Sequence, residues 1–491
     1  LSSQKEKKST LLCLDLTTMP SIGWVLLFFL AVLPALATSG AHGDSKPAFR
    51  CHPDQAATLL QLKKSFSLLR YPNSLESWQD GTDCYFWEGV GCSNSSGHVT
   101  SLKLSGLYSP GLDPAIFNLT SLQRLDLSMN SFGQYSLPAS GFERLSLLTH
   151  LNLSNSGLFG QIPIGIGRLA SLISLDLSTY YDTIPEDYLY GQFDYVYNSL
   201  WLEKPNFQIL VANLDNLREL YLDGVSMSNS REDWCDALAK SLPSLQVLSL
   251  GSCQLDGPIC LSLSTVHSLT VINLQDNFYG SSTPFPEFFM DFLNLSVLNL
   301  AQTNLQGWFP RRTFQSKTLR VLDVSWNQYL SGHVPNFSNA SSLETMMLEW
   351  TNLSFVKPDP FSNFKCLKAL SLDAHFVSME PQSSLGIPRS LQDLKLSQMN
   401  SNSDLGPTLS WIGDLENLLS LELSGHGWVF SQTSLSSVDN LKSLRSLSVS
   451  GCNFTRPVLF GNLVGLKSLE ISYCSFNGPI PSALKKRSNI G

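Results

Sequence analysis

The side chains that catalysis and metal binding depend on are present in this 491-residue sequence, but not at the spacings that such chemistry requires. Its eight histidines are scattered and its ten cysteines contain no C-x-x-C pair, so no metal site is indicated. There is no G-x-S-x-G, no H-E-x-x-H, no phosphate-binding glycine loop and no kinase signature. We therefore expect neither an enzyme nor a bound cofactor.

Carboxylates are the remaining candidates for acid–base chemistry. We place four of them in one register of a repeated strand: Asp126, Asp176, Asp323 and Asp373. A solvated strand position accounts for them better than a catalytic pair does. The net charge of −8 also argues against a nucleic-acid partner.

Two tryptophans indicate a contact surface instead. Trp326 and Trp350 are 24 residues apart, the length of one repeat, so they are expected in one column about 5 Å apart on adjacent strands. Exposed stacked tryptophans are typical of a binding hot spot. We predict a ligand-binding patch made of Val297, Asn299, Val321, Asp323, Trp326, Met347, Glu349 and Trp350. The alternative is that both rings fill space against the turn.

These tryptophans belong to a repeat that runs through most of the chain. Its form at Leu122–Gly133 is L-x-x-L-x-L-x-x-N-x-F-x-G, and fifteen copies are readable. From Leu295 the opening leucines follow four steps of 24 residues, which indicates a solenoid. The period of two in Leu125-x-Leu127 points both leucines inward, and no single copy can bury them alone.

The repeat therefore predicts a right-handed α/β solenoid of horseshoe or superhelical form with one concave parallel β-sheet. We expect repeats over residues 93–484 and strands centred on Leu125, Leu151, Leu248, Leu298, Leu322 and Leu447. Asn130 ends its strand, where an amide can satisfy backbone groups left bare by the turn. Cys253, Cys452 and Cys474 occupy the same slot in other copies, and several copies continue as G-x-[IV]-P.

The full motif, L-x-x-L-x-L-x-x-N-x-L-x-G-x-I-P, resembles the plant-type leucine-rich repeat of receptor-like kinases and receptor-like proteins, over roughly residues 51–484. The segments Glu203–Phe207, Asn216–Val225 and Arg231–Cys235 resemble the receptor-like proteins related to Verticillium-wilt resistance. Cys235 and Cys260 lie about one repeat apart and could pair on the flank.

Residues 51–92 resemble the amino-terminal cap of the same plant family, whose signature is S-W…D-C-C-x-W-x-G-V-x-C. Tyr85 stands where the family has a second adjacent cysteine. Three cap cysteines remain, Cys51, Cys84 and Cys92, so one disulfide can form and one thiol is left over. Both Cys51–Cys84 and Cys84–Cys92 are possible.

The amino-terminal residues have the composition of a targeting segment. We interpret residues 1–18 as translated leader, 19–37 as a signal peptide ending in Ala35-Leu36-Ala37, and 38–50 as a linker. An uncleaved anchor is the competing interpretation. Entry into the secretory pathway makes eight N-x-[ST] acceptors candidate glycosylation sites: Asn94, Asn118, Asn152, Asn294, Asn336, Asn339, Asn352 and Asn453.

Two places depart from the regular repeat. The step from Leu172 to Leu217 is 45 residues, so 178–213 contains either a degenerate repeat or a loop. Six of the fourteen tyrosines fall between Tyr180 and Tyr197, where they either pack against the flank or form a contact surface. Residues 485–491 end the chain without the further repeats, membrane span and tail that family members usually have, so we expect a truncated copy.

The resemblance implies a non-catalytic, extracellular part of an immune receptor that binds a pathogen-derived or apoplastic protein or peptide and signals through a partner receptor kinase. It would lie at the plasma membrane if the full-length gene encodes a span, and in the apoplast otherwise. The alternatives are a secreted inhibitor or decoy resembling polygalacturonase-inhibiting proteins and a developmental peptide receptor.

Overall fold

In the computed structural model the chain forms two compact units, Leu1–Ala48 and Phe49–Gly491. The structure describes residues 51–66, 75–133, 135–179, 200–228, 234–277, 283–355, 361, 363–373, 387–399, 410–430, 432–454, 463 and 465–476. The leader, signal peptide and linker expected at the amino terminus, the tyrosine-rich segment 180–199 and the tail 485–491 lie outside these ranges.

The second unit is organised by one long sheet of short strands, one from each repeat. Seventeen described strands belong to it: β1 (Val90–Cys92), β2 (Val99–Lys103), β3 (Arg124–Asp126), β4 (His150–Asn152), β6 (Ser174–Asp176), β8 (Glu219–Tyr221), β9 (Val247–Ser249), β10 (Val271–Asn273), β12 (Val297–Asn299), β15 (Val321–Asp323), β18 (Thr345–Met347), β20 (Ala369–Asp373), β21 (Asp393–Met399), β22 (Ser420–Phe430), β23 (Ser446–Phe454), β24 (Ser468–Ser472) and β25 (Ser475–Phe476).

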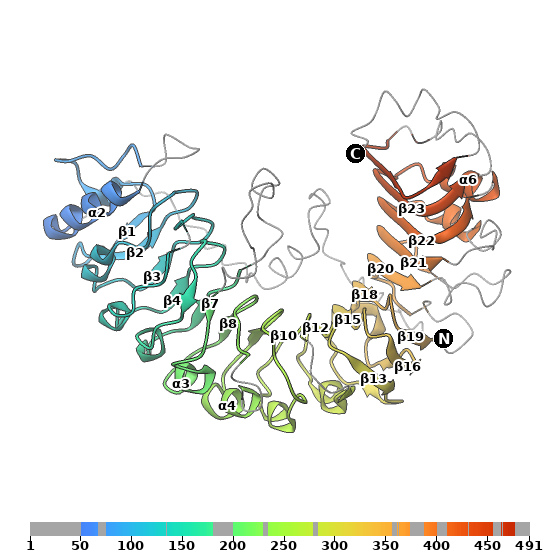
Figure 1. Ribbon diagram of the computed structural model, residues 1–491, viewed down its shortest axis with the longest axis horizontal. Helices are drawn as coiled ribbons and strands as arrows, with labels where there is room; N and C mark the ends of the chain where they lie inside the picture. Colours follow the sequence, from blue (N-terminus) through green and yellow to red (C-terminus); the bar gives the residue numbers. More distant parts are fainter. Residues whose placement is uncertain are drawn as a thin grey trace, which may run out of the picture. The chain divides into compact units, whose positions relative to one another are not determined.

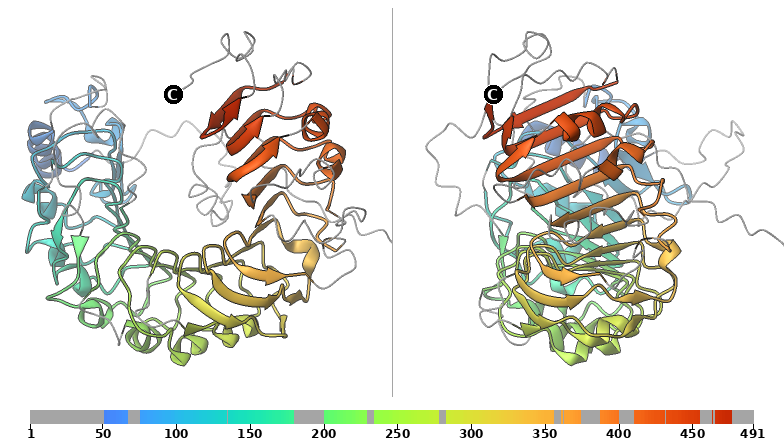
Figure 2. Two further views of the ribbon diagram at one scale, coloured as in Figure 1. Left: turned by 45° about the vertical axis from the view of Figure 1, so that its right-hand side comes forward. Right: turned by 90° about the vertical axis from the view of Figure 1, so that its right-hand side faces the viewer.

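Neighbouring strands of this sheet are parallel, apart from β1, which runs antiparallel to β2. The register shifts within the β21–β22 and β22–β23 pairs. The sheet lines the inner side of the curved stack (Figure 1), and the strands coloured orange to red lie one above another in the right-hand view of Figure 2. The six leucines expected at strand centres all lie in this sheet, for example Leu298 opposite Leu322. The predicted architecture is confirmed.

Inward leucines hold the stack together. Leu122, Leu125, Leu127 and Phe132 of one repeat are each at most 1% exposed. Each side chain of this size stabilises the fold by about 1.5–3 kcal/mol when it leaves water, and here it does so only against the repeats on either side. Leucine spacing therefore dictates both the strand and its stacking.

The asparagine slot links consecutive repeats through buried hydrogen bonds. Asn327 donates to the carbonyls of Leu300 (2.8 Å) and Val324 (2.9 Å), one in the preceding repeat and one in its own. Its Oδ1 accepts from the N–H of Leu305 at 2.8 Å. Asn130 and Asn277 make the same set of contacts. One amide thus satisfies backbone groups of two turns.

The residues around the G-x-[IV]-P motif form a second, shorter set of parallel strands. One sheet contains β11 (Thr283–Pro284), β13 (Leu305–Trp308), β16 (Tyr329–His333) and β19 (Asn352–Ser354), and two pairs are β5 (Gly160–Gln161) with β7 (Leu200–Trp201) and β14 (Thr313–Phe314) with β17 (Asn336–Phe337). Gly332 has φ +107°, and a Cβ there would lie 3.1 Å from the ring of Trp308. Glycine is needed where these strands approach closely.

Short helices return the chain on the outer side of the stack. The described α-helices are α2 (Pro53–Ser65), α3 (Phe207–Val211), α4 (Trp234–Ser241) and α6 (Gln432–Asp439); the 3₁₀ turns are η1 (Cys84–Phe86), η2 (Pro114–Asn118), η3 (Phe142–Arg144), η4 (Ile166–Arg168), η8 (Leu261–Thr265), η9 (Glu287–Asp291), η10 (Ala340–Ser342) and η11 (Ser410–Asp414). Across the described residues, no helix combines the length and the apolar character that crossing a bilayer demands.

The long step between Leu172 and Leu217 does not insert a strand into the main sheet. β6 pairs directly with β8, with Leu175 opposite Leu220. Residues 180–199 lie outside the described residues, so the degenerate repeat and the loop considered for 178–213 both stay predictions.

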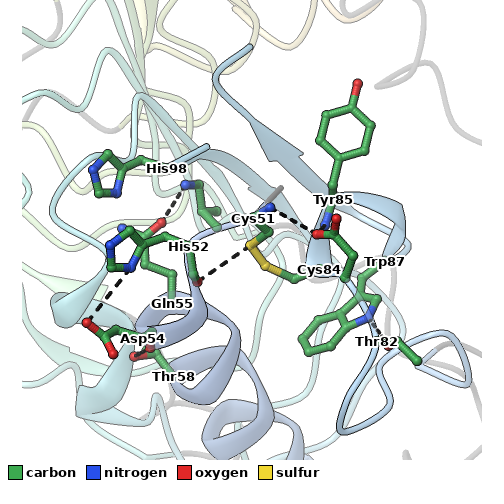
Figure 3. The surroundings of a disulfide bond; sticks show 12 residues. Cys51, His52, Asp54, Gln55, Thr58, Thr82, Cys84, Tyr85, Trp87 and His98 are labelled. Carbon is green, nitrogen blue, oxygen red and sulfur yellow. Dashed lines mark hydrogen bonds and ion pairs between the residues drawn. A yellow bond between two sulfur atoms is a disulfide. The ribbon is translucent and has the colours of Figure 1, made fainter. Parts of the chain in front are cut away.

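The amino-terminal cap contains a disulfide, whose surroundings are drawn in Figure 3. A disulfide joins Cys51 to Cys84, which decides between the two pairings, and Cys92 keeps a free thiol. All three sulfur atoms lie within 4.8 Å of one another. The ring of Tyr85 points away from them, so it does not replace the missing cysteine in the cluster.

Two buried tryptophans pack against each other in the cap. Trp78 and Trp87 stack with ring centres 5.5 Å apart and are 1% and 3% exposed. Their indole N–H groups donate to the carbonyl of Glu88 (2.9 Å) and to Oγ1 of Thr82 (2.7 Å), so burial leaves no polar atom of the two rings unsatisfied.

Candidate ligand-binding face

The predicted patch lies on β12, β15 and β18 and the turns that follow them, but its eight residues are not equally accessible. Trp326 is 43% exposed, while Val321, Asp323, Met347 and Trp350 are half-buried. The remaining three, Val297, Asn299 and Glu349, are buried. Residues that share a column on adjacent strands of this face therefore differ in how exposed their side chains are.

The expectation of outward, exposed side chains is wrong for Val297, Asn299 and Glu349. Val297 lies in register between Val271 and Val321 on the adjacent strands, and it is 1% exposed. The amide of Asn299 is used locally: it donates to Oε1 of Gln275 at 2.6 Å and accepts from the N–H of Ala301 at 3.0 Å. Strands about 4.8 Å apart let neighbouring side chains cover one another.

Trp326 and Trp350 form the stack that their spacing predicts. Their ring centres are 4.9 Å apart and the planes are inclined by 13°. The N–H of Trp326 donates to the carbonyl of Glu349 at 2.8 Å, which continues the main-chain pairing of the two repeats beyond the strands. The rings are thus held in one column by the backbone.

Both tryptophans have left-handed backbone conformations, with φ of +60° for Trp326 and +56° for Trp350. Most other repeats also place a non-glycine residue with this conformation in the same column, among them Met129, Ser252 and Gln302, while Gly224 and Gly451 occupy it in two repeats. The left-handed conformation therefore belongs to the turn of the repeat, and it fixes the direction in which both rings leave the backbone.

A charged cluster beside the tryptophans was not found from the sequence. The carboxylate of Glu349 lies 3.2 Å from Nζ of Lys395 and accepts a hydrogen bond from Oγ of Ser397 at 2.8 Å. Lys395 also lies 3.3 Å from Glu422. Burial disfavours the charge of Lys395, but Glu349 and Glu422 outweigh it and raise the pKa of the lysine. Glu349 is therefore part of a buried ion pair rather than a free contact residue.

The aspartates of the face do not form an acid–base pair. In its own strand, Asp373 lies two residues beyond the position that corresponds to Asp323. Asp323 pairs with Met347, whereas Asp373 pairs with Ser397. The single register expected for the four aspartates is therefore wrong for Asp373. Burial raises the pKa of Asp176 to about 6, although hydrogen bonds from Ser178 oppose the shift.

Other exposed aromatic side chains lie away from this face. Trp308 (70% exposed) and Tyr329 (68% exposed) are on β13 and β16 of the second sheet. They were not singled out from the sequence, although their positions next to Gly307 and before Gly332 would have placed them on the G-x-[IV]-P strands. Because they are exposed on a different sheet, they can serve as control positions in tests of the tryptophan pair.

Most of the predicted glycosylation acceptors lie at the surface. Asn94, Asn118, Asn294, Asn336, Asn352 and Asn453 are exposed, and Asn152 and Asn339 are half-buried. Asn152 is in β4, and its Oδ1 accepts from the N–H and the hydroxyl of Ser154. Glycosylation of all eight acceptors stays a prediction, with Asn152 the least accessible of the strand positions.

A second disulfide lies on the flank of the repeat stack. Cys235, in α4, is bonded to Cys260, with a Cα–Cα distance of 6.0 Å. The pairing considered from the sequence is confirmed. It ties the outer side of one repeat to the next.

Family matches agree with this architecture. Residues 52–93 match the leucine rich repeat N-terminal domain, and residues 147–169, 443–463 and 465–486 match the Leucine Rich Repeat. Together with the parallel sheet and the cap, these matches show that the chain has a leucine-rich-repeat fold.

Its homologues are plant receptor-like proteins. It is 29% identical over 342 residues to Receptor-like protein 6 of Arabidopsis thaliana, a match covering 66% of this chain and 28% of the relative. It is 30% identical over 329 residues to Receptor-like protein EIX1 of Solanum lycopersicum, covering 62% of this chain and 29% of the relative. It is 28% identical over 339 residues to Receptor-like protein Cf-9 of Solanum pimpinellifolium, covering 65% of this chain and 31% of the relative. The matched region spans less than a third of each relative. All three relatives are receptor-like proteins by name.

Solved structures show the same fold. The ectodomain of the membrane receptor kinase GASSHO1/SCHENGEN3 from Arabidopsis thaliana has a TM-score of 0.56 at 21% identity, over 88% of this chain and 55% of that one. The ectodomain of the Arabidopsis receptor kinase HAESA has a TM-score of 0.51 at 23% identity, over 89% of this chain and 80% of that one. The closer likeness to Verticillium-wilt resistance proteins stays a prediction.

Proposed function

We propose that this chain is the extracellular ligand-recognition region of a plant immune receptor-like protein. In this proposal it is non-catalytic, binds a pathogen-derived or apoplastic protein or peptide on the concave sheet, and signals through a partner receptor kinase. The class of the homologues supports the receptor role. The immune setting and the partner kinase are what the resemblance to that class implies.

The tryptophan stack is the observation that carries the location of the site. Two large rings stack in the turns of adjacent repeats with centres 4.9 Å apart, and one of them is 43% exposed. Large aromatic side chains supply much contact area with only two side-chain torsions to restrict, which lowers the entropy lost on binding. Trp326 and Trp350 are therefore our proposed anchors, with the half-buried Val321 and Met347 as their apolar margin.

The chemistry around the anchors favours a peptide or protein over a small metabolite. The contact surface extends over two adjacent strands, β15 and β18, and their turns, and the charges next to it are already paired, as in the Glu349–Lys395 contact. The two structures with the same fold are complexes, one with CASPARIAN STRIP INTEGRITY FACTOR 2 and one with an IDA peptide hormone. A polypeptide segment laid across the strands fits such a surface.

The test is photocrosslinking from defined positions of the secreted chain. Benzoylphenylalanine is placed at Trp326 or at Trp350, and the protein is exposed to apoplastic fluid from infected plants. The matched control carries the same probe at Tyr329, which is exposed on the second sheet. We expect a polypeptide adduct from the two tryptophan positions and not from Tyr329.

The adduct must also depend on the rings themselves. Trp326→Ala and Trp350→Ala should each weaken binding of the isolated adduct partner by about thirtyfold, the loss typical of a hot-spot side chain. Equal crosslinking from Tyr329, or binding that survives both substitutions, would show that the site is elsewhere. An adduct that proves to be a secreted cell-wall hydrolase inhibited by the chain would favour the inhibitor interpretation instead.

A further inference from the structure

Two cysteines stand in the asparagine slot of consecutive repeats at the carboxy-terminal end of the described sheet. Cys452 belongs to β23, and Cys474 lies between β24 and β25. The strands on either side of the two residues are parallel, with Ser450 opposite Ser472 and Asn453 opposite Ser475. This register places the cysteines directly across from each other.

Their sulfur atoms are in close contact. The Sγ–Sγ distance is 2.9 Å, shorter than the roughly 3.5–4.0 Å at which non-bonded carbon atoms pack. The N–H of Cys452 donates to Sγ of Cys474 at 3.3 Å. Residues across from each other on neighbouring strands have Cα atoms about 4.8 Å apart, within the range of about 4.4–6.8 Å that a disulfide needs. The spacing of the strands therefore permits a bond between these two side chains.

The pair replaces the asparagine contacts that hold the other repeats together. Asn277 and Asn327 each donate to carbonyls of two repeats. A thiol is a weak donor and cannot do this; Cys474 reaches only the carbonyl of Val449, at 3.7 Å. In this slot the two repeats are therefore joined only by weak sulfur contacts, and a covalent bond between the two cysteines would strengthen the link.

The two thiols are also suited to exchange chemistry. The hydrogen bond from Cys452 lowers the pKa of Cys474 to about 7, which makes a thiolate available near neutral pH. Cys474 is half-buried and can be reached by a small disulfide, while Cys452 is 1% exposed behind it. Cys253 occupies the same slot in an earlier repeat, but burial raises its pKa and its neighbours in the slot are Val225 and Asn277.

We propose that Cys452 and Cys474 are an oxidation site that forms an inter-repeat disulfide by exchange with a low-molecular-weight disulfide such as oxidised glutathione. The Cys474 thiolate attacks one glutathione sulfur, forms a mixed disulfide and releases one glutathione thiolate. Cys452, losing its proton, then attacks the Cys474 sulfur and releases the second glutathione. The two cysteines are oxidised by two electrons, and one glutathione disulfide is reduced to two thiols.

Peptide mapping of the whole chain tests the bond directly. The folded protein is incubated with oxidised or reduced glutathione, free thiols are alkylated with iodoacetamide, and the digest is analysed by mass spectrometry. We expect a linked peptide pair containing Cys452 and Cys474 after oxidation, lighter by two hydrogens than the separate peptides, and its loss after reduction. Cys253→Ser should leave the linked pair unchanged, and Cys474→Ser should abolish it.

A second measurement follows the consequence for the fold. Repeat proteins open locally at their ends, so the bond should slow amide hydrogen exchange in β23 and β24 while exchange in β9 and β10 stays the same. This slowing should be absent from Cys474→Ser. If both thiols of the wild-type protein remain fully alkylated after oxidation, or if either is linked to a different cysteine, the proposal is wrong. Mapping of the wild-type chain decides this even if a variant does not fold.

Discussion

Single side chains in the asparagine slot decide how firmly one repeat is attached to the next. Asn327 is 1% exposed and bonds backbone groups of two repeats. Thr351, in the same slot one repeat later, donates only to the carbonyl of Leu348 in its own repeat, at 2.7 Å. The two residues therefore differ in the number of groups left without partners when they are removed.

This difference predicts unequal losses of stability. Asn327→Ala should lower the free energy of unfolding by about 3–5 kcal/mol, since each abandoned buried group costs about 1–3 kcal/mol. Thr351→Val should cost only about 1 kcal/mol. Urea unfolding followed by tryptophan fluorescence measures both. Equal effects of the two substitutions would contradict the inter-repeat role of the amide.

The tryptophan pair permits a second comparison at this scale. Trp326→Ala should change the free energy of unfolding by less than about 1 kcal/mol, because its ring is 43% exposed. Trp78→Ala, in the buried cap, should cost about 3–5 kcal/mol. Thermal unfolding of the two variants is the measurement. A fall of many degrees for Trp326→Ala would mark the ring as packing filler and remove it from the proposed site.

At the scale of single strands, the polar side of the sheet is more buried than its alternating sequence indicates. All three residues of β9, β10 and β12 are buried, although only the central residue of each points into the leucine core. On this side Asp223 accepts from Oγ of Ser249 and from the amide of Asn273. Hydrogen bonds between columns, rather than contact with water, satisfy these groups.

Burial of a carboxylate in such a strand gives a pH dependence. Asp176 in β6 has a pKa of about 6, above the roughly 3.9 of an unfolded chain, so the folded state binds more protons between these values. The free energy of unfolding should therefore fall as pH rises from about 4 to about 6, by on the order of 2 kcal/mol for this group.

Asp176→Asn isolates that contribution, since the amide keeps an acceptor for Ser178 but does not titrate. We expect the stability of the variant relative to wild type to increase as pH rises through 4 to 6 and to level off above pH 7. Denaturant unfolding at a series of pH values checks this. A difference that does not change with pH would mean that Asp176 titrates normally in the folded protein.

At the scale of the whole repeat unit, stability depends on every repeat having a neighbour on both sides. In β23 the inward Leu447 and Val449 are fully buried, whereas the equivalent Leu469 and Ile471 of β24 are only half-buried. A parallel strand with half-covered apolar residues and unpaired main-chain groups is a template for association.

We therefore expect a polypeptide of residues 38–491 to self-associate in solution. Fusing a polar capping repeat after residue 484 should return it to a monomer, because the cap supplies the missing neighbour. Light scattering at several protein concentrations distinguishes the two. A monomeric uncapped polypeptide would show that the half-buried strand does not act as an edge.

The repeat register by itself determined the inward leucines, the asparagine slot, the parallel sheet and the column shared by Trp326 and Trp350. These features depend on the period of the sequence, and a fixed period becomes a fixed position once the repeats stack. Even the 4.9 Å ring separation follows from strand spacing alone.

Only the tertiary structure decided which outward side chains are accessible and which sulfurs are joined. Glu349 is buried because it reaches Lys395 and Ser397 two strands away, a contact that no single repeat contains. Cys51 pairs with Cys84 rather than Cys92 through an arrangement of helix, turn and strand. Burial and cross-linking depend on distances between separate repeats, and the period sets those distances only along a column.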